Sequence, residues 1–145
     1  AGILRAILDM NREQPQRLAE MAESAVGKLK DKKAAVLGLA FKPGTDDVRD
    51  APSLKVIAAL LEKGASVRAY DPVAIDNARK VLPRSVKFCA SAAQAVKDAD
   101  CVIVVTEWDE FKVESLYNGK VVIDGRRVLD PRRAGEFCDY HGICW

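Results

Sequence analysis

The chain has 145 residues, 49% of them hydrophobic and 30% charged, and 23 basic against 21 acidic side chains leave a net charge of +2. This length suits one domain with a sizeable core and excludes a multi-lobed enzyme, and the composition excludes a disordered or collagen-like chain. A charge so near zero gives no strong field that would gather nucleic acid, so any anion site must be local.

Two further features indicate a cytoplasmic protein with reduced thiols. The apolar runs are too short to span a membrane, and the first residues lack the charge order of a signal peptide. The cysteines show irregular spacing and no C-x-x-C pair, which is typical of free thiols. They are Cys89, Cys101, Cys138 and Cys144.

Residues 1–30 form a helical lead in which apolar residues recur at helical spacing from Ile3 to Leu29. Pro15 is expected to divide this segment into two helices, because proline removes a backbone donor. The first helix has no visible N-cap, so we expect the chain to begin within a longer helix. Residues 31–145 are then expected to form the ligand-binding domain.

After Lys33, short apolar runs alternate with helical stretches bounded by turn residues. The runs predicted as strands are 34–40, 67–70, 86–88, 101–106, 121–124 and 141–144. The stretches predicted as helices are 52–63, 73–81, 92–98, 111–117 and 131–137. Runs such as Cys101–Val105 are apolar on both faces, as in a covered parallel sheet. The pattern predicts an α/β fold: a Rossmann-like, doubly wound, mostly parallel six-stranded sheet with helices on both faces, preceded by the helical lead.

Ligands of such sheets bind outside the carboxyl ends of the strands. The first loop there does not carry a dinucleotide fingerprint, because Ala40 and Pro43 stand where glycines are required. It does not match the phosphate-binding P-loop either. Asp71 ends the second strand where a ribose-binding acid would lie, although an Asp-Pro turn is the simpler interpretation. Lys42 is either an anion ligand or a solvated side chain.

The fifth strand ends in Asp124-Gly-Arg-Arg127, which places two guanidinium groups at the edge of the predicted cleft. Arginine's planar fork suits phosphate oxygens. Neighbouring residues of an extended chain point in opposite directions, so at most one of Arg126 and Arg127 would face the ligand, and the other would pair with acidic side chains. The residues alone do not decide which. Lys42 and Arg126 are expected at the ends of neighbouring parallel strands.

Two groups of residues suggest metal sites, and each has a simpler interpretation. Asp46, Asp47 and Asp50, with Asp109, are more typical of turns and helix starts than of a metal pocket. The corner formed by Cys138, His141 and Cys144 lacks a fourth ligand and a standard zinc spacing. No metal site is predicted.

Two aromatic residues of the fourth loop, Trp108 and Phe111, could stack on a base or sugar, but we expect them to cap the core. The single histidine is not placed beside a serine or cysteine in a nucleophile pattern.

Four ordered motifs resemble the C-terminal region of the UDP-glucose/GDP-mannose dehydrogenase family, and the resemblance covers essentially the whole chain. They lie at Val36–Leu54, Ala69–Pro72, Thr106–Trp108 and Asp124–Arg127. Members that act on UDP-glucose are the most similar, and Asn11–Pro15 resembles the end of the central helix through which the family dimerises.

The resemblance implies oxidation of the sugar C6 alcohol of UDP-glucose to a carboxylate with two NAD, in polysaccharide biosynthesis. The NAD domain and the cysteine nucleophile would belong to an N-terminal part that this chain lacks, so no catalytic residue is assigned and the isolated chain is expected to be inactive. GDP-mannose or a UDP-N-acetyl sugar is an alternative substrate, and an oligomerisation domain without catalysis is an alternative role.

By residue match, the resemblance assigns three side chains to the nucleotide sugar and one to the cofactor. Phe41 and Lys42 match the Phe-Lys pair that contacts the sugar nucleotide, and Arg126 matches the arginine that contacts UDP. Arg49 matches an arginine that reaches the NAD pyrophosphate across the cleft.

Overall fold

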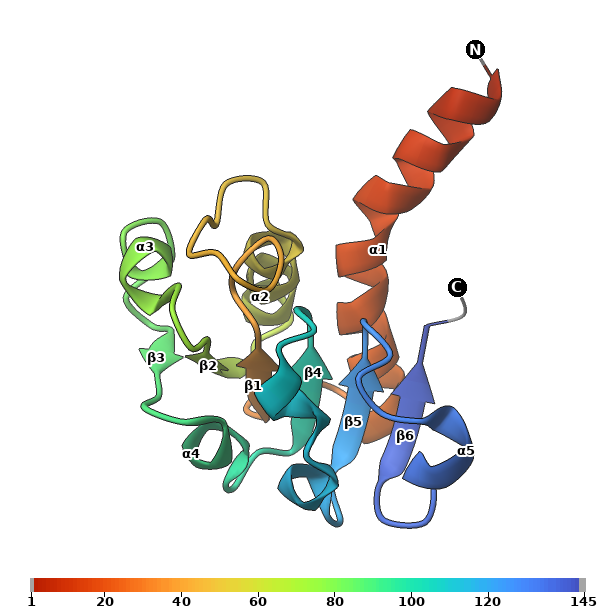
Figure 1. Ribbon diagram of the computed structural model, residues 1–145, viewed down its shortest axis with the longest axis vertical. Helices are drawn as coiled ribbons and strands as arrows, with labels where there is room; N and C mark the ends of the chain where they lie inside the picture. The colour runs from red at the N-terminus through yellow and green to blue at the C-terminus, as the bar shows by residue number, and fades with distance from the viewer. Residues whose placement is uncertain (1, 144–145) are drawn as a thin grey trace.

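The computed structural model describes residues 2–143, with side chains described from Gln14 onward. Its first element is a single helix, α1 (Gly2–Val26), with Pro15 inside it. The prediction of two helices was wrong. Proline removes one backbone donor, and the helix continues past it because Leu18 and Ala22 are buried against the sheet. Figure 1 shows the N-terminal turns of α1 extending beyond the sheet.

Six strands form one sheet in the order β3-β2-β1-β4-β5-β6, and every neighbouring pair is parallel. This order is that of a doubly wound Rossmann-like sheet, so the predicted fold is confirmed. The order reverses between β1 and β4. The strands are β1 (Lys33–Leu37), β2 (Ser66–Tyr70), β3 (Lys87–Phe88), β4 (Cys101–Val104), β5 (Val121–Asp124) and β6 (Asp139–Gly142).

Short helices connect the strands and lie close to the predicted positions. The prediction at 111–117 was a single helix, whereas the structure has two 3₁₀ turns there, η1 (Asp109–Lys112) and η2 (Glu114–Tyr117). The α-helices are α2 (Pro52–Glu62), α3 (Ile75–Arg79), α4 (Ala92–Val96) and α5 (Pro131–Ala134).

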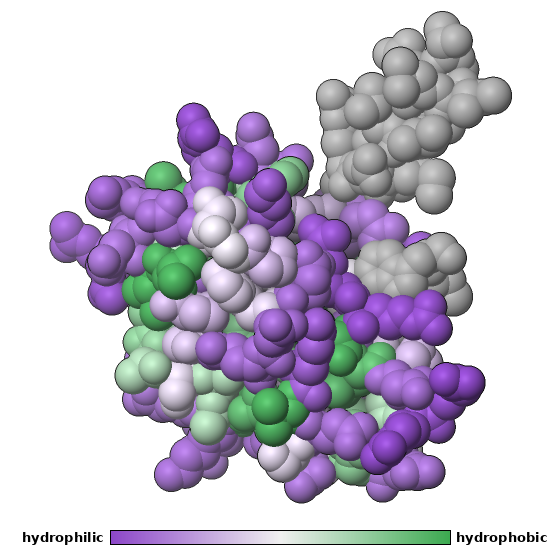
Figure 2. All heavy atoms as spheres, in the orientation of Figure 1, coloured by the Kyte–Doolittle hydropathy of each residue, from purple (hydrophilic) through white to green (hydrophobic). Residues whose placement is uncertain are grey.

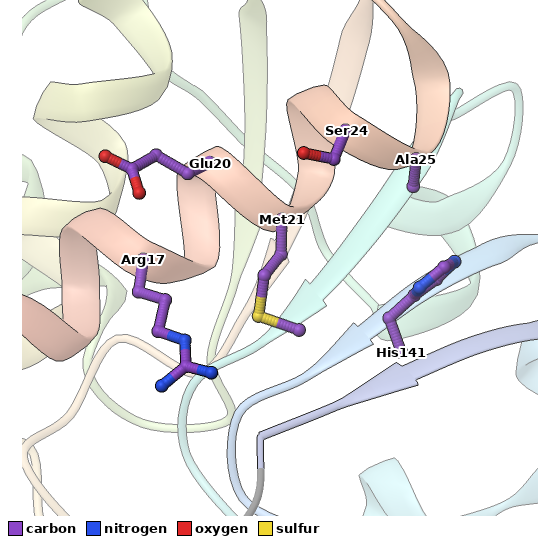
Figure 3. A pocket seen from close by; sticks show the side chains of 6 residues that line it. All are labelled: Arg17, Glu20, Met21, Ser24, Ala25 and His141. Atoms are coloured by element: carbon purple, nitrogen blue, oxygen red, sulfur yellow. The ribbon is translucent and has the colours of Figure 1, made fainter.

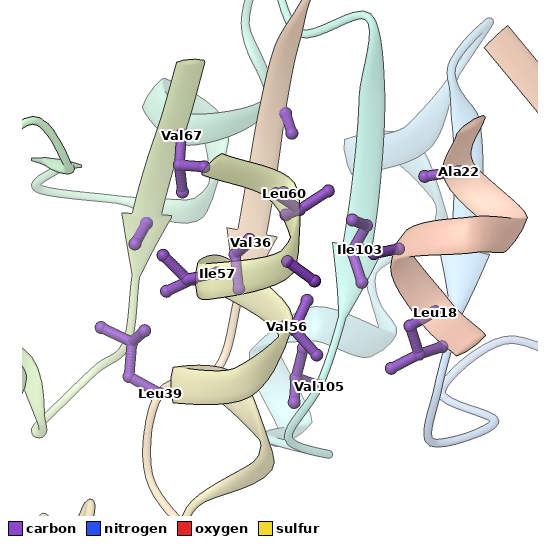
Figure 4. Packing of buried hydrophobic residues seen from close by; sticks show 14 of the residues in the cluster. Leu18, Ala22, Val36, Leu39, Val56, Ile57, Leu60, Val67, Ile103 and Val105 are labelled. Atoms are coloured by element: carbon purple, nitrogen blue, oxygen red, sulfur yellow. The ribbon is translucent and has the colours of Figure 1, made fainter. Parts of the chain in front are cut away.

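The core lies on both faces of the sheet because successive strand residues point to opposite sides. Along β1, Ala34 and Val36 belong to the cluster covered by α1, α2 and α3. Ala35 and Leu37 belong to the cluster covered by α4, the 3₁₀ turns and α5. Figure 4 shows the first cluster, in which residues of α1 and α2 meet the strands.

The outer surface is mostly polar on the face seen in Figure 2, where hydrophobic residues form small separate spots. Within the described residues, no helix is both long enough and apolar enough to cross a membrane.

Candidate functional site

A cavity of about 530 Å³ lies at the carboxyl ends of β1, β4 and β5, where the strand order reverses. This is the position at which ligands bind in open α/β sheets. Its wall combines one guanidinium group, one carboxylate and several apolar side chains. The lining residues are Gln14, Pro15, Leu18, Phe41, Asp50, Pro52, Val105, Gly125 and Arg126.

Arg126 is held at the cavity by the loop that follows β4. Its Nε donates to the carbonyl oxygen of Val105 at 3.0 Å and lies 3.5 Å from Oε2 of Glu107. Both side chains are a little over one-third exposed. Among the described residues, none accepts a hydrogen bond from the terminal amines of Arg126. The Nε edge therefore orients the group, and the edge formed by the two terminal amines has the geometry that suits an anion such as phosphate.

The loop that carries Arg126 is shaped by a buried carboxylate, Asp124, at the end of β5. Asp124 accepts hydrogen bonds from the backbone N–H groups of Arg126, Val128 and Leu129, each at 3.1 Å. The Tyr140 hydroxyl donates to it at 2.9 Å, and burial raises the pKa of this phenol. The four donors fix the turn that follows β5, so the start of the Arg126 side chain has a defined position.

Phe41 and Lys42 lie in the loop after β1, which ends at Leu37, and their surroundings differ. Phe41 lines the cavity, is 51% exposed, and its N–H donates to the carbonyl oxygen of Asp47 at 2.8 Å. Lys42 is exposed and does not line the cavity. The prediction that Lys42 and Arg126 follow neighbouring strands was wrong, because β4 lies between β1 and β5. Strand order depends on long-range pairing, which the local pattern does not contain.

The base of the loop after β1 is packed closely against the start of the loop after β4. Gly38 has φ +96°, and a Cβ at this position would lie 2.5 Å from Cβ of Thr106. The Thr106 hydroxyl donates to the carbonyl oxygen of Ala40, and the Ser53 hydroxyl donates to that of Leu39, both at 2.8 Å. These buried hydroxyls hold the loop base in one conformation.

Asp71, at the end of β2, is buried and accepts five hydrogen bonds. The donors are the backbone N–H groups of Leu39, Ala40, Val73 and Ala74 and the indole N–H of Trp108. A carboxylate has about four lone-pair directions, so no acceptor is left for a ribose hydroxyl. With Ala40 and Pro43 in place of glycines, this loop does not fit a dinucleotide cofactor.

Arg49 lies outside the cavity that contains Arg126. Its side chain is 87% exposed, and Nε and Nη2 bond the two oxygens of Asp47 at 3.1 and 3.0 Å. Hydrogen bonding to Arg49 lowers the pKa of Asp47. The pair borders a separate hollow of about 560 Å³ that also contacts Asn77 and Lys80 of the α3 region.

The aromatic residues of the fourth loop serve the core, as expected. Phe111 is fully buried and packs edge-on against Tyr70, with 6.1 Å between ring centroids. Trp108 is partly buried, packs against the core clusters and donates to Asp71.

Two of the four acidic residues considered for a metal site have basic partners instead. Asp47 accepts from the N–H of Arg49 at 2.9 Å, and Asp109 lies 2.8 Å from Nζ of Lys112. Among the residues that the structure describes, no three or more His, Cys, Asp or Glu side chains group closely enough to hold a metal ion.

In the Cys138–Cys144 corner, Cys138 Sγ donates to the carbonyl oxygen of Ala134 at 3.3 Å, and Cys144 lies outside the described residues. A hollow of about 340 Å³ between α1 and His141 is shown in Figure 3, where Glu20 and Arg17 point in different directions. No loop at a strand's carboxyl end lines this hollow.

The cysteines are packing residues where the structure describes them. Cys89, Cys101 and Cys138 are buried free thiols, and burial raises the pKa of each, that of Cys101 to about 12. A buried thiol with a raised pKa is a poor nucleophile.

The residues that position the site were not predicted from the sequence. Glu107 was not singled out, although it stands in a loop at a strand's carboxyl end, and Asp71 was interpreted only as a ribose acid or turn former. The contribution of α1, through Pro15 and Leu18, could not be inferred, because it requires the helix to lie beside β5.

Comparison with known proteins gives one family model that matches residues 35–131, described as the UDP-glucose/GDP-mannose dehydrogenase family, UDP binding domain. UDP-glucose 6-dehydrogenase AglM of Haloferax volcanii is 41% identical, over 97% of this chain and 33% of its own. UDP-glucose 6-dehydrogenase TuaD of Bacillus subtilis is 36% identical, over 97% of this chain and 32% of its own. The chain thus spans about a third of the length of these curated relatives.

Solved structures show the same similarity. A UDP-glucose dehydrogenase from Pyrobaculum islandicum superposes with a TM-score of 0.85 at 40% identity, covering 93% of this chain and 30% of that one. A UDP-D-ManNAc dehydrogenase from Pyrococcus horikoshii gives a TM-score of 0.77 at 30% identity, covering 99% of this chain and 34% of that one.

Proposed function

Because the chain belongs to the UDP-glucose/GDP-mannose dehydrogenase family, we propose that it is the nucleotide-sugar-binding portion of a UDP-glucose 6-dehydrogenase. The complete enzyme would oxidise UDP-glucose to UDP-glucuronate with two NAD. The observation that carries the proposal is the position of Arg126, which lines a cavity at the switch point of the sheet and whose terminal amines have no acceptor among the described residues.

The chemistry of the cavity suits a sugar diphosphate. Two terminal amines of one guanidinium group can form paired, charge-assisted hydrogen bonds to phosphate oxygens. Phe41 and Val105 offer apolar contact for a base or sugar ring, and the Asp50 carboxylate can accept from hydroxyls. Lys42, next to Phe41, adds a positive charge that could approach the diphosphate from the exposed side of the loop.

The cofactor and the chemical step belong, in this proposal, to a second domain outside this chain. The loop after β1 does not fit a dinucleotide, and the described cysteines are buried. Arg49, on the exposed tip of that loop, would approach the pyrophosphate of an NAD held by that domain. A cytoplasmic location, as expected from the sequence, is part of the proposal.

Calorimetry with UDP tests the binding site. The chain should bind UDP weakly, and Arg126→Ala and Lys42→Ala should each lower the affinity. Wild-type affinity in both variants would reject the site.

An activity assay tests whether the chemical step requires a second domain. The isolated chain should not reduce NAD with UDP-glucose, and turnover by it would overturn the proposal. The same calorimetry with GDP-mannose and a UDP-N-acetyl sugar would test the alternative substrates, and tighter binding of either would replace UDP-glucose.

A second role, assembly, is favoured by the course of α1, whose N-terminal turns extend past the sheet in Figure 1. A helix that leaves its own domain can pack against a second copy, so a homodimer is proposed. Sedimentation velocity should show a dimer, and a monomer at all concentrations would argue against it.

A further inference from the structure

We propose that Asp71 is a positioning residue for the nucleotide-sugar site, a role that rests on the proposed function. Asp71 lies at the end of β2 and does not line the cavity. Its carboxylate joins the two loops that face each other across the switch point, one carrying Phe41 and the other holding Arg126.

The first connection is to the loop after β1. Oδ2 of Asp71 accepts from the N–H groups of Leu39 at 2.8 Å and Ala40 at 2.9 Å. Ala40 immediately precedes Phe41, so these bonds fix the backbone from which the Phe41 side chain enters the cavity wall.

The second connection is to the loop after β4. The same Oδ2 accepts from the indole Nε1 of Trp108 at 3.1 Å. Trp108 follows Glu107, whose carboxylate lies 3.5 Å from Nε of Arg126. One oxygen atom therefore anchors both the segment that presents Phe41 and the segment that orients Arg126.

The third connection steadies the carboxylate itself. Oδ1 accepts from the N–H groups of Val73 and Ala74, both at 2.9 Å. All five donors need an acceptor, and an ionised carboxylate is the side chain that offers acceptors only. An asparagine at this position would turn an N–H group toward some of these donors and leave them unsatisfied.

Two substitutions and one control separate positioning from mere stability. Asp71→Asn disturbs every connection. Trp108→Phe removes only the indole donor and keeps an aromatic side chain. Asp100→Asn is the control, because Asp100 also accepts from a backbone N–H, that of Lys33 at 2.8 Å, at the start of β1 and so at the opposite edge of the sheet.

We expect UDP affinity, measured by calorimetry well below each melting temperature, to fall about tenfold in Asp71→Asn and about threefold in Trp108→Phe. Such losses correspond to about 1.4 and 0.7 kcal/mol. Asp100→Asn should lower the melting temperature and keep the affinity of the unsubstituted chain. If Asp71→Asn does not fold, Trp108→Phe decides.

A double-mutant cycle measures whether Trp108 and Arg126 are coupled in UDP binding, which a purely stabilising role of Trp108 would not produce. If Trp108 acts through the orientation of Arg126, Trp108→Phe should have less effect on UDP affinity in an Arg126→Ala background than alone. Equal affinity of the unsubstituted chain and both variants, or additive losses in the cycle, overturns the positioning role. Absence of UDP binding by the unsubstituted chain would instead refute the proposed function, and this role with it.

Discussion

Arg126 and Arg49 are both paired with a carboxylate at the same edge of the sheet, yet their surroundings differ. Arg126 is held by the loop of another strand, through the carbonyl oxygen of Val105 and the carboxylate of Glu107. Arg49 pairs with Asp47, two residues away on its own exposed loop. The orientation of Arg126 depends on the folded sheet, whereas that of Arg49 depends on the conformation of one loop.

This difference matters for binding because ordering a long side chain costs about 0.5–1.5 kcal/mol of affinity. In the proposed site, Arg126 would be ordered before the ligand arrives, so more of its electrostatic attraction would appear as binding. Arg49 is held instead by Asp47 on its own loop, and it would have to give up that pair to bind a ligand. The same contrast runs along the loop after β1, from its buried base at Leu39 and Ala40 to its exposed tip.

The largest expected effect concerns the base and tip of that loop. Gly38→Ala should destabilise the fold by about 2–5 kcal/mol, because the new Cβ would lie 2.5 Å from Thr106 at φ +96°. Gly44→Ala, with φ +84° and nothing within 4 Å, should cost only about 1 kcal/mol. Urea denaturation measures both, and equal losses would contradict a rigid base with an open tip.

The next effect compares the two arginines directly. Arg126→Ala should weaken UDP binding by about tenfold or more, since charge-assisted hydrogen bonds contribute about 1.5–3 kcal/mol. Arg49→Ala should leave UDP affinity within about twofold, because the exposed pair lies at a separate hollow. A larger loss from Arg49→Ala than from Arg126→Ala would reverse the comparison.

Salt should distinguish the exposed charge from the partly buried one. The loss of UDP affinity caused by Lys42→Ala should become smaller when the salt concentration rises from about 0.05 to about 0.5 M. Lys42 is exposed, and at about 0.1 M salt the attraction between exposed charges is largely screened beyond about 10 Å. The loss on Arg126→Ala should shrink less, because it also reflects oriented hydrogen bonds. Calorimetry at several salt concentrations measures both losses. An equal salt dependence of the two losses would contradict the difference in exposure between Lys42 and Arg126.

The smallest effect concerns the cysteine thiols, which lie apart from both Arg126 and Arg49. Burial raises the pKa of Cys89, Cys101 and Cys138, so few thiolates form at pH 8 and labelling of the folded chain should be slow. A Cys144→Ser variant isolates these three, and urea should release them. Fast labelling of that variant without urea would show that the core opens readily.

The individual strands and helices could largely be predicted from sequence because their signals are local, whereas the strand order could not. Strand β5 was predicted with the observed bounds, and α2 began at Pro52 as expected, since apolar runs and turn residues determine both. The division of α1 at Pro15 failed because packing of Leu18 and Ala22 outweighs one lost hydrogen bond.

The candidate site was less predictable because it is made by distant contacts. Local patterns left Arg126 and Arg127 equivalent, and only the family resemblance favoured Arg126. The structure supplies the physical difference, namely the contacts of Arg126 Nε with the loop after β4. The five donors of Asp71 come from three loops, and no spacing rule brings them together.

The most direct test of the account is a titration of the ¹⁵N-labelled chain with UDP, followed by NMR. The amide signals of Phe41, Gly125 and Arg126, which line one cavity, should shift together, while those of Arg49 and Lys80 stay in place. Shifts confined to Arg49 and Lys80, or no shifts at millimolar UDP, would contradict binding at the carboxyl ends of β1, β4 and β5.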